Sequence, residues 1–271
     1  MEWKNIYRGL LIGASDVIPG VSGGTIAVLL GIYDRLIGAI NGLFSRRWKD
    51  QLTFLIPLGI GVAIAIFTLA RLMKWLLAYY PAPTYFFFLG LIVGIIPQLL
   101  SEANAYRTFK NKHVILLIIG LLAVASMKIF IDMDPGAIIV ERSLRVYTLL
   151  FFSGILASAA MILPGISGSV VFLMIGVYPT IIDIINELEI VAIIVVAIGI
   201  GLGIVSMSKV IHYFLKHFRT NTFAIIIGAV IGSIFVIFPG WPEQTSLVLG
   251  CLIAGASGLL GAYILGKVEY K

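Results

Sequence analysis

The stretch that decides the fold is GLLIGASDVIPGVSGGTIAVLLGIYDRLIGAIN at residues 9–41, which recurs as GILASAAMILPGISGSVVFLMIGVYPTIIDIIN at residues 154–186. The two copies align without a gap at a constant offset of 145, with 12 identities in 33 positions. Both are broken near the middle by P-G-[V/I]-S-G, because proline lacks a backbone donor and restricts the residue before it.

A second pair of segments aligns at an offset of 138, where Arg71 matches Lys209 and the pair Gly90/Gly94 matches Gly228/Gly232. Two blocks that recur in the same order indicate an internal duplication. Glycines four residues apart in an apolar run are typical of helix-packing faces.

The composition indicates a membrane protein. The 271 residues are 60% hydrophobic and 12% charged, whereas a soluble domain has about 25% charged residues. One cysteine and three histidines exclude an intramolecular disulfide and give no metal-ligand cluster. The net charge of +6 comes from basic residues in short loops, as the positive-inside rule predicts, so we expect no nucleic-acid binding. No cofactor is expected.

Six further apolar runs are long enough to cross a bilayer, three in each half: 52–73, 84–101, 114–131, 190–211, 222–238 and 246–266. Each repeated segment is too short for two crossings of about 20 residues. We therefore expect re-entrant hairpins of two short half-helices at 9–42 and 147–187. Such a broken backbone is tolerated at membrane depth only when it is buried in protein or lines a wet cavity.

Three crossings is an odd number, so repeat two (141–271) should be inverted relative to repeat one (1–140). With a cytoplasmic N-terminus, the inside loops hold 12 Lys and Arg and the outside loops hold 3, which supports this orientation. The sequence thus predicts an all-α polytopic protein with one membrane domain (1–271) of two inverted-topology repeats, each a re-entrant helical hairpin plus three transmembrane helices. We expect it in the bacterial cytoplasmic membrane with both termini in the cytoplasm.

The two breaks are the candidate site. Inverted repeats with broken helices are typical of secondary transporters, whose substrate binds near the midplane. Each tip combines glycines, hydroxyls and unpartnered N–H groups at a half-helix start, which suits an anion and above all a phosphate. The candidate residues are Ser22, Gly23, Gly24 and Thr25 at the first tip and Ser167, Gly168 and Ser169 at the second. Alternatively, small residues let the tips pack together with serine as an N-cap; the two interpretations are compatible.

Ionisable residues within apolar segments are functional candidates because they are costly there. Asp16 precedes Pro19 by three residues, and its counterpart is Met161. Asp16 could pair with a cation, or take up a proton and couple transport to a proton gradient.

Four cations, Arg71, Lys74, Lys128 and Lys209, could neutralise a phosphate. The alternative is that their long side chains extend to the interface. Asp34 and Arg35 are expected to form a local ion pair.

Enzyme signatures are weak, since the sequence has no HExxH motif, no P-loop and no nucleophile elbow. The residues alone therefore favour a transporter of an anion.

The segment SDVIPGVSGGTIAVLLGIYDRLI (15–37), with its echo MILPGISGSVVFLMIGVY (161–178), resembles the bacterial and archaeal family long called domain of unknown function 368, now described as polyprenyl-phosphate transporters. The resemblance covers essentially the whole chain. It implies a non-enzymatic flippase that returns undecaprenyl phosphate from the outer to the cytoplasmic leaflet for envelope synthesis, with the phosphate held at the two tips.

Two alternatives stay open beside this one. The first is a transporter of a small anion coupled to protons or sodium, and the second is a membrane enzyme acting on lipid phosphates. The sequence leaves the coupling ion and the oligomeric state open.

Overall fold

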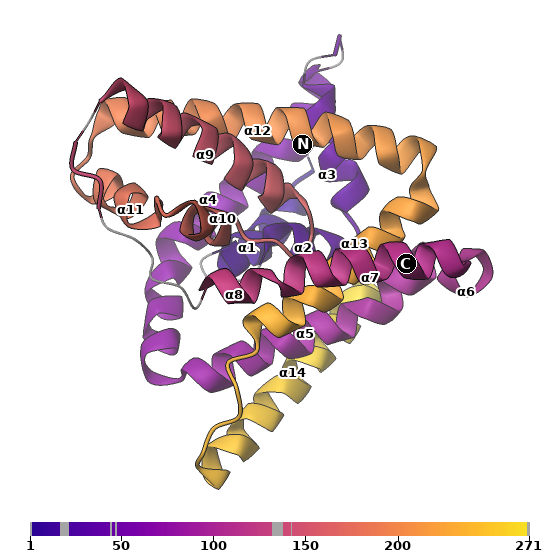
Figure 1. Ribbon diagram of the computed structural model, residues 1–271. Coiled ribbons are helices and arrows are strands. Elements are labelled where there is room, and N and C mark those ends of the chain that lie inside the picture. The colour runs from indigo at the N-terminus through magenta and orange to yellow at the C-terminus, as the bar shows by residue number, and fades with distance from the viewer. Residues whose placement is uncertain are drawn as a thin grey trace.

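The computed structural model describes residues 2–16, 22–43, 45–46, 48–131, 138–141 and 143–269, and its regular elements there are all helices (Figure 1). The helices are α1 (Asn5–Asp16), α2 (Gly23–Leu29), α3 (Tyr33–Gly42), α4 (Trp48–Tyr79), α5 (Pro81–Glu102), α6 (Ala105–Thr108), α7 (Asn111–Ala125), α8 (Met127–Ile131), α9 (Leu144–Ile162), α10 (Gly168–Ile175), α11 (Tyr178–Asn186), α12 (Ile190–His217), α13 (Arg219–Ile237) and α14 (Thr245–Glu269). Seven of them contain stretches long and apolar enough to span a membrane. This confirms the prediction of an all-α polytopic membrane protein.

Each repeated segment forms three helices, whereas the sequence predicted two half-helices. A second break separates α2 from α3, which bend by 118°, and α10 from α11, which bend by 112°. The break falls at Gly31 (φ 63°) and Gly176 (φ 79°), in the left-handed region that glycine adopts without strain. In the second segment α9 has 19 residues and is itself a candidate span, in addition to the six apolar runs predicted from the sequence. Its counterpart α1 has 12 residues.

The first helix of each repeated segment packs along a long helix that follows it. A methyl group at Gly9 would meet the carbonyl oxygen of Leu58, and one at Gly13 would lie 2.8 Å from the Ala65 Cβ. The contacts advance together along both chains, so α1 and α4 run parallel. The helices α9 and α12 run parallel in the same way (Figure 1). The chain between them must return toward the side where the first helix begins, as it would in either a re-entrant loop or a broken span.

The remaining long helices pair across the two halves, α5 with α14 and α7 with α13 (Figure 1). Matched glycines make matched contacts. A methyl group at Gly120 would meet the carbonyl of Ile225, and one at Gly258 would meet that of Phe87. Gly258 stands 138 residues after Gly120, and Ile225 stands 138 residues after Phe87. Each pair runs parallel, as expected if the second half is inverted, and the two halves interlock.

The glycine pairs singled out in the sequence lie on these interfaces. Methyl groups at Gly90 and Gly228 would meet the carbonyl oxygens of Gly255 and Leu117. Their prediction as helix-packing faces is confirmed. The largest buried cluster includes Ile26 and Leu29 of α2, so the helix that follows the first tip packs into the core.

Candidate functional site

The two tips contact each other through hydrogen bonds. The Gly165 N–H donates to the Thr25 hydroxyl at 2.8 Å, and the Tyr33 hydroxyl donates to the Ile162 carbonyl at 3.0 Å. Pro19 and Gly20 of the first tip lie outside the described residues. From Ser22 onward, the first tip is bonded to the end of α9 and to the break that follows it.

At the first tip, side chains already occupy the helix N-terminus. The Gly23 N–H donates to Asp16 Oδ1 at 2.8 Å, and the Gly24 N–H donates to Ser22 Oγ at 3.2 Å. The buried Ser22 hydroxyl also donates to the Met161 carbonyl at 3.4 Å. A carboxylate and a serine are favourable caps because they satisfy donors that lack intrahelical partners. The N-cap interpretation therefore holds for this tip.

The second tip offers donors instead. Ser167 has the extended backbone of an N-cap residue, but its hydroxyl bonds Ser169 Oγ at 2.8 Å. This pair has two O–H donors and uses one of them, so one remains to donate elsewhere. Within the described part of the chain, Ser167 does not cap α10 through its side chain. Met161 stands where Asp16 stands in the first segment, so the N–H groups of Gly168 and Ser169 face no capping carboxylate at this position.

A cavity of about 130 Å³ adjoins the first tip. Asp16, Gly23, Gly24, Tyr33 and Ser158 supply its polar lining, and the other lining side chains are apolar. Asp16 is the charged residue in that lining as far as the chain is described. The cavity therefore presents a carboxylate beside bare backbone in an apolar surrounding.

Of the four predicted cations, the two whose side chains the structure describes, Lys128 and Lys209, do not line this cavity. Arg71 and Lys74 lie on α4, and their side chains are outside the described part of the structure. Lys209 lies on α12, is exposed, and is not among the residues that line the tip cavity. Lys128 donates to the Phe238 carbonyl at 3.0 Å.

Asp34 pairs with a distant arginine and not with its neighbour in sequence. Arg219 Nη1 lies 2.7 Å from Asp34, and Arg219 Nη2 lies 3.4 Å from Glu102. Arg35 donates instead to Gln51 Oε1 at 2.7 Å, so the expected local pair is replaced. The cluster joins the start of α13 to α3 and the end of α5.

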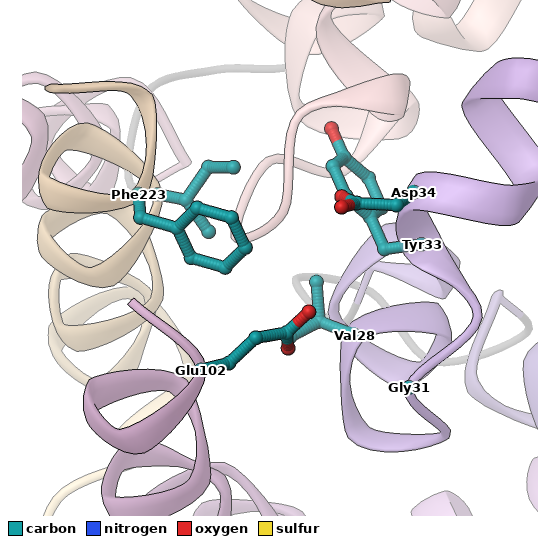
Figure 2. A pocket seen from close by; sticks show the side chains of 7 residues that line it. Val28, Gly31, Tyr33, Asp34, Glu102 and Phe223 are labelled. Carbon is teal, nitrogen blue, oxygen red and sulfur yellow. The ribbon is translucent and has the colours of Figure 1, made fainter. Parts of the chain in front are cut away.

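Tyr33 is the site residue that sequence reasoning missed. It is 5% exposed and lines the tip cavity as well as two other cavities. Figure 2 shows it beside Asp34, with Glu102 and Phe223 facing them across the smallest cavity. Its identity with Tyr178 in the second repeat was the available signal.

Comparisons with known proteins agree with one another. The profile of the VCA0040-like family, described as undecaprenyl phosphate translocase-like, matches residues 12–250. The chain is 42% identical to a polyprenyl-phosphate transporter of Staphylococcus aureus, covering 98% of this chain and 97% of the relative. It is 33% identical to one of Vibrio cholerae, covering 91% and 80%. No solved structure matches. The chain belongs to the undecaprenyl phosphate translocase-like family.

Proposed function

We propose that this protein moves undecaprenyl phosphate from the outer to the cytoplasmic leaflet, so that the lipid carrier is reused in cell-envelope synthesis. The contact between the two tips is the observation that carries this proposal. It joins Thr25 of the first repeat to Gly165, three residues before the start of α10, and so supports a phosphate site shared by the two repeats. Two relatives named polyprenyl-phosphate transporters support the choice of substrate.

The second tip is the better phosphate site of the two. The N–H groups of Gly168 and Ser169 and the free O–H of the Ser167–Ser169 pair are donors of the kind that bind phosphate at helix starts. At the first tip, a phosphate would have to displace the Asp16 carboxylate from Gly23. The positive charge that a phosphate needs would come from Arg71, Lys74 and Lys209.

Asp16 would make the two tips bind the phosphate alternately. Its carboxylate repels a phosphate as long as it stays charged at the start of α2. A proton on Asp16, or a cation such as sodium beside it, would remove that repulsion and open the N–H groups of Gly23 and Gly24. Ion coupling of the lipid movement would then act through this residue.

The membrane setting follows from the same proposal. We place the protein in the bacterial cytoplasmic membrane with both termini in the cytoplasm, and we assign it transport and no catalysis. The polyprenyl tail would remain in apolar surroundings while the phosphate crosses between the tips.

Purified protein in liposomes tests the function directly. Fluorescent undecaprenyl phosphate is incorporated, and the fraction in the outer leaflet is followed by quenching from outside. We expect leaflet exchange well above that of protein-free liposomes. Exchange no faster than in empty liposomes would refute the proposal, and release of inorganic phosphate would indicate an enzyme.

A further inference from the structure

An apolar groove of about 410 Å³ lies between α7, α12 and α13. Met207, Val210 and Phe214 of α12 and Ile225 and Ile226 of α13 line it. Its volume falls within the ~300–1,000 Å³ of pockets that bury small ligands. Val210 and Phe214 are each 46% exposed, so the groove opens laterally between helices.

The groove adjoins the tip cavity, and one of its lining residues, Leu163, stands four residues before Ser167 of the second tip. Tyr33 lines both the groove and the tip cavity. Its hydroxyl donates to the carbonyl of Ile162, and the next residue, Leu163, lines the groove. Leu163 directly precedes the Pro164-Gly165 break. The buried Tyr33 side chain therefore borders both a polar cavity and an apolar groove that opens sideways.

The two sides of Tyr33 differ in polarity. On the cavity side are a carboxylate and bare glycine backbone. On the groove side nearly all lining residues are aliphatic or aromatic, with polar side chains at Asn221 and Thr222. We propose that the groove binds the isoprene units next to the phosphate of a polyprenyl phosphate. This inference rests on the proposed function and adds the tail site to it.

Selection of this tail over a phospholipid chain would come from shape. Lipid chains are as apolar as the groove, so the gain in a membrane is van der Waals packing. An isoprenoid carries a methyl branch on every unit, and we expect the mixed side chains of Met207, Phe214 and Ile225 to pack against such branches. A straight acyl chain would leave gaps beside the same wall.

The matched positions of the other half are occupied by larger side chains. Phe87 and Phe88 stand 138 residues before Ile225 and Ile226, and their rings pack edge to face with centroids 5.4 Å apart. Isoleucine is smaller than phenylalanine, and Ile225 and Ile226 both line the groove. We therefore expect one tail site, on the α12–α13 side, and a larger residue there should fill it.

Photocrosslinking tests the tail site independently of transport. The probe is a polyprenyl phosphate with a diazirine in an isoprene unit next to the phosphate, in liposomes of phosphatidylethanolamine and phosphatidylglycerol. We expect crosslinks on residues 207–214 and 222–226, reduced several-fold by unlabelled undecaprenyl phosphate and unaffected by added phosphatidylglycerol. Crosslinks spread over the outer helix faces, or equal competition by phosphatidylglycerol, would overturn the tail site.

Variants supply the matched comparison. Ile225→Trp and, separately, Met207→Trp should reduce the groove crosslinks and the leaflet exchange several-fold. Ile198→Trp, on an exposed face of α12 outside the groove, should leave both unchanged. If the unaltered protein exchanges lipid but Ile225→Trp and Ile198→Trp change the crosslinks and the exchange equally, the tail site is refuted. An unaltered protein that crosslinks in the groove but does not exchange lipid would refute the transport proposal alone.

Discussion

Asp16 holds the start of α2 because its carboxylate accepts the Gly23 N–H at 2.8 Å. The second repeat has Met161 at that position, and the Ser167 hydroxyl bonds Ser169 there without capping α10. The matched tips therefore differ at Asp16/Met161 and also at Gly24/Ser169, the position that supplies the partner of Ser167. The sequence predicted the tip residues and the inequality of Asp16 and Met161, since both are visible in the alignment. It could not predict the Asp16–Gly23 hydrogen bond, which joins the end of one helix to the start of another.

Replacing Asp16 tests its role as a cap. Asp16→Ala should lower the free energy of unfolding by about 1 kcal/mol, the usual cost of losing a cap. Asp16→Asn keeps an acceptor oxygen and should retain most of that stability. Unfolding of the purified variants in detergent, followed by circular dichroism, measures the difference. Equal stability of Asp16→Ala and the unaltered protein would show that the bond contributes nothing.

Among the helices, small residues set how closely neighbours approach. The spacing of Gly90 and Gly94 was enough to predict a packing face, because a helix repeats its surface every four residues. The partner helix was beyond prediction, since α5 packs on α14 from the other half of the chain. The second break at Gly31 and Gly176 was also missed. Both glycines lie inside apolar runs, and only their positive φ angles set them apart.

Two glycines of α14 provide a matched pair of variants. A methyl group at Gly258 would collide with the Phe87 carbonyl, whereas one at Gly250 would meet nothing within 4 Å. Gly258→Ala should therefore destabilise the protein by about 1–3 kcal/mol, the usual cost of overpacking. Gly250→Ala should stabilise it by up to about 1 kcal/mol through helix propensity.

Unfolding in detergent, with the same readout for both, compares the two variants. A Gly258→Ala protein as stable as Gly250→Ala would contradict the close contact between α5 and α14.

For the whole molecule, the direction of the helices is the strongest link between sequence and structure. The Lys/Arg bias predicted an inverted second half, and the parallel pairs α5–α14 and α7–α13 fit it. The interlocking of the halves could not be predicted, because it depends on contacts between helices far apart in sequence. Lys128 and Lys209, two of the cations expected around the phosphate, do not line the tip cavity, and the side chains of Arg71 and Lys74 lie outside the described structure. A sequence pattern does not predict in which direction a long, exposed side chain such as that of Lys209 extends.

Cysteine labelling tests the orientation in intact cells. Cys251 is the one cysteine and is buried, so Cys251→Ala gives a background without reactive thiols. In it, Ser45→Cys should be protected from a membrane-impermeant maleimide, and Leu188→Cys should be labelled. Both positions are exposed, so access depends on the membrane side. The reverse pattern would overturn the assigned topology.

The central claim, that polyprenyl phosphate crosses at the tips, is tested most directly by leaflet exchange in liposomes with two serine variants. Ser167→Leu removes a hydroxyl at the start of α10, and Ser257→Leu makes the same change on an exposed face of α14. Both should insert and melt at temperatures close to the unaltered protein. We predict that Ser167→Leu loses exchange of undecaprenyl phosphate while Ser257→Leu keeps it. Exchange by Ser167→Leu at the unaltered rate would contradict the account.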